Sequence, residues 1–272
     1  MALLARLFDR FVAQHWRAID EERQDGDRGD LRAVLTVVTS AVVLTCMQYI
    51  ILRGALQEAV ASQLPELVTR LGAPRFGALL GEYRSLLRNI TWSLGCAFFY
   101  LVVPGALVKL VFRERLRDWG LSTAGYFKHL WVYAVLFLPV GAAVCAVSFS
   151  EAFQQSYPFY KSAKGVADLV VWEMFYALQF FTLEFFFRGF MLHGLRRRLG
   201  VGAIFVMVVP YCMIHFQKPI LETLAAILAG LVLGVLSLRT RSVLGGATIH
   251  VAVAVSMDIA ALAQTGGLRP PG

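Results

Sequence analysis

The chain has 272 residues, of which 58% are hydrophobic even before its 23 glycines are counted and only 16% are charged. This composition excludes an ordinary soluble enzyme, and its 20 Phe, 9 Tyr and 5 Trp exclude a disordered chain. A net charge of +8 is compatible with a nucleic-acid partner, but the basic residues are scattered between long apolar runs, as at the ends of membrane helices. We therefore predict an all-α, polytopic membrane protein with no nucleic-acid partner.

Residues 1–32 differ from the rest of the chain because they combine an amphipathic pattern with many charges. Apolar residues at helical spacing predict a helix lying on the membrane; they are Leu4, Leu7, Phe8, Phe11 and Trp16. A charged linker follows, and no apolar signal-peptide core follows the start. We expect a cytoplasmic N-terminal segment without a cleaved signal, and a first span that stays as an anchor.

Seven later segments approach the roughly 20 apolar residues that cross a bilayer as a helix. They are 33–52, 90–112, 129–149, 166–195, 200–216, 220–238 and 243–264. The fourth is long enough to tilt, protrude or break, and the fifth is short. Residues 53–88 form a second amphipathic stretch outside the membrane. We expect three parts: the N-terminal segment 1–32, the N-terminal transmembrane helices in 33–164, and a catalytic helical core in 165–264.

The orientation in the membrane follows from the lysines and arginines of the loops. With a cytoplasmic N-terminus, the inner segments hold 15 of these residues and the outer segments hold 9. The positive-inside rule therefore favours this orientation, with the protein in a membrane such as the bacterial inner membrane.

Ionisable residues inside apolar spans are costly, so each one is a functional candidate. The candidates all follow residue 165; they are Asp168, Glu173, Glu184, Arg188, His215, Glu222, His250 and Asp258. Glu184 and Arg188 are four residues apart and can form an ion pair on one helix face, for catalysis or only for helix packing. Glu184 and His215 each lie about 15 residues from the turn at 196–200, which places both about 20 Å from it in an antiparallel hairpin.

His250 completes a set suited to hydrolysis. Gly245 and Gly246 allow close helix approach just before it, and Asp258 follows on nearly the same face. A carboxylate can take a proton from water, one imidazole can orient that water, and a second can stabilise the oxyanion. Glu184, His215 and His250 could instead hold zinc, although the sequence lacks an HExxH spacing. The favoured prediction uses no cofactor.

Three ordered motifs resemble those of the CPBP family of intramembrane endopeptidases, the CAAX proteases and bacteriocin-processing enzymes also called the ABI family. The family signature is EExxxR, then FxxxH, then HxxxN or a variant. The matching segments are LEFFFR (183–188), YCMIH (211–215) and HVAVA (250–254), and the resemblance covers about residues 165–260. It implies a metal-independent glutamate mechanism that cleaves a membrane-associated protein or peptide, such as a prenylated C-terminus or a precursor.

The first motif is degenerate, and the other two also depart from the pattern. Leu183 replaces the first glutamate, which the family generally uses to activate water; Tyr211 replaces Phe, and Ala254 replaces the asparagine credited with oxyanion contact. Either Glu184 has taken the catalytic role or the protein is an inactive relative. Glu222 and Asp258 are same-face carboxylates that could orient the imidazoles or supply the missing acid.

Two other function classes remain open beside an endopeptidase. An inactive relative would act as a membrane scaffold or regulator. A proton-coupled transporter would use the same buried Glu and His as a relay, but the repeated or broken helices of many transporters are not evident in the sequence.

Overall fold

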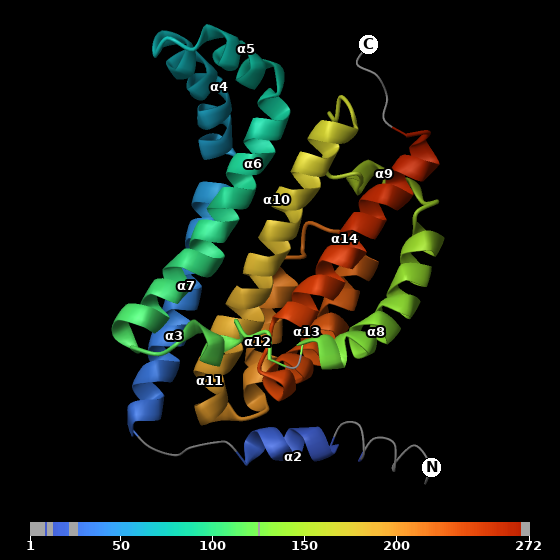
Figure 1. Cartoon of the computed structure of the whole chain (residues 1–272). Helices are drawn as coiled ribbons and strands as arrows, with labels where there is room; N and C mark the ends of the chain where they lie inside the picture. The colour runs from blue at the N-terminus through green and yellow to red at the C-terminus, as the bar shows by residue number, and fades with distance from the viewer. Residues whose placement is uncertain (1–8, 10–12, 22–26, 125, 268–272) are drawn as a thin grey trace. The chain divides into compact units, whose positions relative to one another are not determined.

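The computed structural model describes residues 9, 13–21, 27–124 and 126–267, and every regular element in these ranges is a helix (Figure 1). The predicted all-α fold is therefore confirmed. Of the expected N-terminal amphipathic helix, Leu4, Leu7, Phe8 and Phe11 lie outside the described residues. Trp16 lies in helix α2 (Gln14–Asp20) and packs edge-on against Phe205, with 5.8 Å between the ring centroids.

Several long helices are continuous through short π-helical turns, which are labelled η. The first part of the chain contains α3 (Asp27–Cys46), η2 (Met47–Ile51), α4 (Ala55–Arg70), α5 (Pro74–Glu82), α6 (Arg84–Ala97), η3 (Phe98–Val102), α7 (Val103–Ala106), η4 (Leu107–Val111) and the 3-10 turn η5 (Leu116–Trp119). The second part contains α8 (Tyr126–Val147), α9 (Glu151–Ser156), α10 (Val166–Glu184), η6 (Phe185–Met191), α11 (Leu192–Leu199), α12 (Gly202–Met213), α13 (Ile220–Thr240) and α14 (Leu244–Thr265).

Six helices among the described residues are long and apolar enough to cross a membrane. They are Leu31–Ile51, Arg84–Val111, Tyr126–Val147, Val166–Leu199, Ile220–Thr240 and Leu244–Thr265. The predicted segment 200–216 forms the shorter helix Gly202–Met213, which at 1.5 Å per residue spans only about 18 Å. The polytopic membrane class is confirmed, with six clear spans and one shorter apolar helix at the fifth segment, which was expected to be short.

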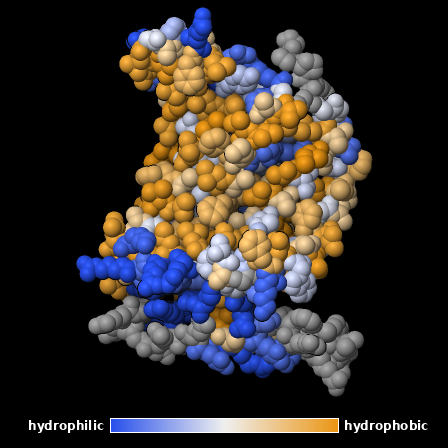
Figure 2. Space-filling model, viewed as in Figure 1, coloured by the Kyte–Doolittle hydropathy of each residue, from blue (hydrophilic) through white to orange (hydrophobic). Residues whose placement is uncertain are grey.

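Large apolar side chains cover much of the face that Figure 2 shows. Phe127, Leu110 and Ile220 are 80%, 75% and 73% exposed. A soluble protein rarely exposes a contiguous apolar surface of this extent, whereas a membrane protein turns such a surface toward lipid.

The chain divides into two compact units. The first unit contains 1–41, 104–134 and 184–249, and the second contains 42–103, 135–183 and 250–272. The division of the sequence at residues 32 and 164 stays a prediction.

The first unit depends on glycines where α12 and α13 pack. A Cβ atom at Gly230 would lie 2.8 Å from Val208 Cγ2, and one at Gly234 would lie 3.0 Å from Ile204 Cγ2. Small residues at these two positions allow the helices to approach closely. In lipid there is no hydrophobic driving force between helices, so the van der Waals contacts of this close packing stabilise the pair.

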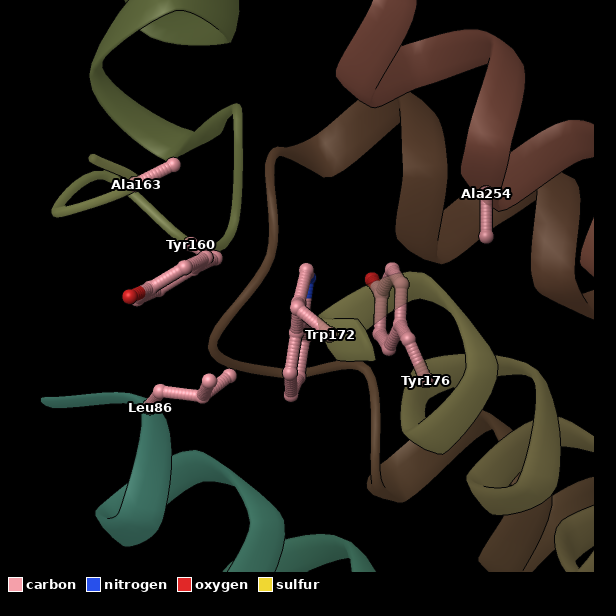
Figure 3. Close-up of a cluster of buried hydrophobic side chains, with 6 residues drawn as sticks. All are labelled: Leu86, Tyr160, Ala163, Trp172, Tyr176 and Ala254. Carbon is pink, nitrogen blue, oxygen red and sulfur yellow. The ribbon is translucent and has the colours of Figure 1, made fainter. Parts of the chain in front are cut away.

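The second unit is built around an aromatic cluster beside α10 (Figure 3). Its buried members are Leu86, Tyr160, Ala163, Trp172, Tyr176 and Ala254. Trp172 stacks on Tyr176 with 4.9 Å between ring centroids, and Phe159 stacks on both rings. The stack supplies large dispersion contacts along the first half of α10.

Asp168 has a structural role at the start of α10. Its carboxylate accepts hydrogen bonds from the backbone N–H groups of Lys164 and Gly165, both at 2.8 Å, and from the Tyr160 hydroxyl at 3.0 Å. Burial and this hydrogen bond raise the pKa of the Tyr160 hydroxyl, so it stays a donor. Asp168 therefore satisfies the donors that precede the helix.

We expect Asp168→Ala to lower the free energy of unfolding by about 1–3 kcal/mol, because it leaves buried donors without an acceptor. Unfolding in mixed detergent micelles measures this change. Asp118→Ala is the control, since the Asp118 side chain is 58% exposed, and its expected change is within about 0.5 kcal/mol. Equal losses in the two variants would contradict a structural role for Asp168.

Candidate active site

Glu184 and Arg188 form the predicted ion pair in the first unit. Arg188 Nη1 donates to Glu184 Oε1 at 2.9 Å, and both side chains are fully buried. The pair forms because residues four apart share a helix face. The guanidinium offsets the cost of burying the carboxylate and keeps it in its charged form.

The backbone around this pair is π-helical. Glu184 is the last residue of α10, and all seven residues of η6, Phe185–Met191, are buried. The Ser237 hydroxyl of α13 donates to the Arg188 carbonyl oxygen at 3.0 Å. Isolated π-helical turns inside α-helices occur frequently at functional sites, and this one contains the last four residues of the first motif, 185–188.

Gly246 brings α14 directly against the Glu184 carboxylate. A Cβ atom at Gly246 would lie 2.6 Å from Glu184 Oε2, and one at Gly245 would lie 2.0 Å from Tyr133 Cζ. The predicted close helix approach at these two glycines is confirmed. The physical reason is that only a hydrogen atom fits between the α14 backbone and the carboxylate.

We expect Gly246→Ala to lower the free energy of unfolding by about 1–3 kcal/mol, because the new methyl group cannot fit without displacing the carboxylate from Arg188. Unfolding in mixed detergent micelles measures the effect. Gly202→Ala is the matched control: its Cβ would lie at an ordinary 3.6 Å from Leu199 Cβ. Equal stability of Gly246→Ala and Gly202→Ala would show that α14 does not pack closely against Glu184.

Tyr211 connects the first motif to the second within the same unit. The Arg188 Cζ atom lies 3.8 Å from the centroid of the Tyr211 ring, a cation–π contact. The carbonyl oxygen of Tyr211 accepts a hydrogen bond from His215 Nδ1 at 2.8 Å, and the two rings lie 4.9 Å apart. In a neutral imidazole this bond leaves the lone pair on Nε2, so His215 can act as a base or acceptor there.

His215 lies in a turn and not within a spanning helix, which corrects the expected placement. Helix α12 ends at Met213, and the backbone N–H of His215 donates to the Cys212 carbonyl oxygen at 2.9 Å. The Thr223 hydroxyl, on α13, donates to the His215 carbonyl oxygen at 2.8 Å. The apolar pattern continues through residue 214, but the chain must turn before Pro219 to begin the next helix.

The other candidates have different surroundings. Glu222 lies in the first turn of α13, with its carboxylate 3.9 Å from Lys218 Nζ.

Two further candidates lie in the second unit. The His250 ring lies 4.4 Å from the Phe180 ring. Asp258 is 1% exposed, accepts a hydrogen bond from the Phe159 backbone N–H at 3.0 Å and contacts Glu173. Asp258 thus helps to join α14 to the loop before α10.

Sequence reasoning noted Tyr211 only as a substitution and did not identify Ser237. The signal for Tyr211 was its spacing of four residues before His215, which brings its carbonyl within reach of the imidazole where the helix ends. Ser237 carried no signal, because its contact with Arg188 depends on how α13 packs. Across the residues with described positions, no three His, Cys, Asp or Glu side chains group closely enough to hold a metal ion.

Comparison with known proteins identifies the part of the chain that carries the motifs. Residues 165–256 match the family model of type II CAAX prenyl endopeptidase Rce1-like proteins. No curated protein and no solved structure matches the chain. The match begins just before α10 and ends within α14, so it contains LEFFFR, YCMIH and HVAVA in order. The segment 165–256 therefore matches the CAAX protease family, as the three motifs predicted.

Proposed function

We propose that this protein is an intramembrane endopeptidase that hydrolyses a peptide bond of a membrane-associated protein or peptide. The observation that carries the proposal is the buried Glu184–Arg188 pair, connected through Tyr211 to His215 in the segment that matches the CAAX protease family. General acid–base hydrolysis needs a carboxylate that can take a proton and an imidazole in a fixed orientation, and Arg188 and Tyr211 link two such groups here.

In the proposed reaction, Glu184 takes a proton from a water molecule whose oxygen adds to the peptide carbonyl carbon. His215 orients that water through Nε2, and His250 of the third motif stabilises the developing oxyanion. When the carbon–nitrogen bond breaks, the leaving nitrogen takes up the proton from Glu184. Because the carboxylate is fully buried, the helices around it must separate locally to admit water and peptide.

Leu183 makes Glu184 central to this proposal. A leucine cannot take or give a proton, so Glu184 is the one carboxylate left in the first motif. Glu222 is the alternative acid to test. It lies in the first turn of α13, next to Thr223, whose hydroxyl donates to the His215 carbonyl oxygen. An inactive relative acting as a scaffold is the alternative, and it predicts no turnover at all.

The test is to incubate the purified full-length protein in detergent with a library of prenylated and unmodified peptides, and to identify products by mass spectrometry. We expect cleavage by the native chain and none by Glu184→Ala. A folded native chain that cleaves no peptide, including precursor peptides, would support the inactive relative.

Metal dependence is tested in the same assay. We propose that no metal takes part, so EDTA should leave turnover unchanged. Inhibition by EDTA with rescue by zinc would instead indicate that Glu184, His215 and His250 are the ligands of a zinc ion.

We further propose a bacterial inner-membrane location with a cytoplasmic N-terminus, supported by the excess of basic residues in the inner segments. Topology reporters fused after Arg198 and after Lys218 should label opposite sides if the short α12 crosses the membrane. Labelling of one side by both fusions would show that α12 turns back, and would reverse the orientation of α13 and α14.

A further inference from the structure

The oxygen of Glu184 that faces away from Arg188 is covered by the first turn of α14. Arg188 Nη1 donates to Oε1 at 2.9 Å, and a Cβ atom at Gly246 would lie 2.6 Å from Oε2. The Glu184 side chain has no exposed surface. From this side, water or a peptide can therefore reach Oε2 only when the α14 backbone at Gly246 moves away.

The residues just before this turn are fixed to the loop that precedes α8. The Val243 backbone N–H donates to the Gly120 carbonyl oxygen at 2.9 Å, and the Ser242 hydroxyl donates to the Ser122 carbonyl oxygen at 2.6 Å. Both bonds hold the chain at 242–243 in place. A helix attached at its first residues can tilt about that attachment, so residues 242–243 are suited to act as a hinge for α14.

Beyond this hinge, the first turns of α14 lie beside the first turns of α8 (Figure 1). A Cβ atom at Gly245 would lie 2.5 Å from the Tyr133 hydroxyl oxygen. Tyr133 is 4% exposed, and its hydroxyl forms a hydrogen bond with Thr240 at the end of α13. This bond ties α8 to α13, whereas Gly245 has no side chain to tie α14 to α8. The α14 turn can therefore leave the Tyr133 ring while α8 stays in place.

About one turn further along α14, a hydrogen bond does join the two helices. The hydroxyl oxygens of Tyr126 and Thr248 lie 2.7 Å apart. Because the Thr248 hydroxyl donates its one proton to the Leu244 carbonyl oxygen at 2.9 Å, Tyr126 is the donor to Thr248. We call this Tyr126–Thr248 bond the latch. Separating α8 from α14 here requires breaking it.

The latch lies at a surface that faces lipid. Thr248 is exposed although it belongs to a membrane-length helix. Phe127 and Trp131, on the neighbouring face of α8, are 80% and 66% exposed. Large apolar side chains on the outside of a membrane helix face acyl chains. Separation of α8 from α14 at the latch would therefore open the covered carboxylate toward lipid.

We propose that substrates reach Glu184 from the lipid, between α8 and α14, when the latch opens and α14 tilts about residues 242–243. This inference rests on the proposed endopeptidase function and specifies the route by which its substrate enters. Because the opening faces acyl chains, the bond that is cleaved must itself pass through the membrane interior, and an anchor alone is not enough.

Two variants remove the latch in different ways. Tyr126→Phe removes the donor and Thr248→Val removes the acceptor, so each should favour the open state by about fivefold, the value of one hydrogen bond. The double variant loses the same single bond and should show the same change. Thr265→Val is the matched control on α14, because the Thr265 hydroxyl donates within its own helix, to the Ala261 carbonyl oxygen at 2.9 Å.

The readout is the labelling of Glu184 by the lipid-soluble reagent dicyclohexylcarbodiimide, in the purified full-length protein in nanodiscs, with the label located by peptide mass spectrometry. We expect slow labelling of the native chain, and about fivefold faster labelling in Tyr126→Phe, in Thr248→Val and in the double variant. Thr265→Val should stay within about twofold of the native rate. Native-rate labelling in both latch variants, additive gains in the double variant, or no label at Glu184 in any chain would overturn the proposal.

A water-soluble carbodiimide distinguishes entry from lipid from entry from water. Its labelling rate at Glu184 should differ by less than about twofold between the native chain and the latch variants. Faster labelling by this reagent alone would place the opening in water and overturn the proposal. Labelling needs no turnover, so the two proposals fail separately. A chain that labels as expected but cleaves no peptide would contradict the proposed function, whereas cleavage without a latch effect on labelling would contradict only the lipid route.

Discussion

Glu184→Gln is expected to lower the turnover of a cleaved peptide by about 10²- to 10⁴-fold, the usual contribution of a general base. The glutamine amide has nearly the same shape and its oxygen can still accept from Arg188 Nη1, but it cannot take a proton from water. The effect should therefore fall on the rate at saturating substrate. Single-turnover cleavage in detergent, with folding checked by thermal unfolding, separates this result from misfolding.

Two further glutamate-to-glutamine variants are compared with Glu184→Gln. Glu66→Gln makes the same change in a glutamate that also has an arginine four residues later, but with a side chain that is 72% exposed. It should have no effect on turnover. Glu222→Gln tests the substitute acid. If it lowers turnover as much as expected for Glu184→Gln while Glu184→Gln itself remains active, the water-activating base is Glu222 and the assignment of Glu184 is wrong.

Arg188→Met is expected to lower the free energy of unfolding by about 3–5 kcal/mol. Methionine fills much of the volume of the arginine stem but leaves the Glu184 carboxylate buried without its partner. The exposed pair of Glu66 and Arg70 has the same residue types at the same spacing, with 3.6 Å between its charged atoms. Arg70→Met should change stability by less than about 0.5 kcal/mol. Unfolding in mixed micelles measures both variants.

The double variant Glu184→Gln, Arg188→Met identifies the cause of the loss. If the cost of Arg188→Met comes from the uncompensated carboxylate, replacing Glu184 with neutral glutamine should restore much of the stability. Additive losses in the double variant would instead assign the effect to the packing of Arg188 on Tyr211.

The local parts of the site were predictable from the sequence. The Glu184–Arg188 pair follows from a spacing of four residues on a helix, and the close approach at Gly246 follows from two adjacent glycines. The order LEFFFR, YCMIH and HVAVA indicated the CAAX protease family before any contact was visible. These features depend on residues near one another in the chain, or on a pattern that a whole family shares.

Helix ends and contacts between helices were less predictable. The apolar run through 200–216 hid the end of α12 at Met213, because hydropathy measures preference for lipid and does not record where the backbone turns. Asp168 was a functional candidate for the same reason. The groups that donate hydrogen bonds to its carboxylate come from the loop before α10, and hydropathy does not record them.

The sequence by itself determined the membrane class, the all-α fold, the match of residues 165–256 to the CAAX protease family, and the charged residues that a bilayer would otherwise exclude. Only the tertiary structure decided which groups those charges meet. It placed Arg188 over Tyr211, directed Nδ1 of His215 to a carbonyl oxygen and buried the His193 side chain completely. The physical reason is that hydropathy and local spacing act along one helix, whereas the partner of a buried polar group is chosen by how separate helices pack.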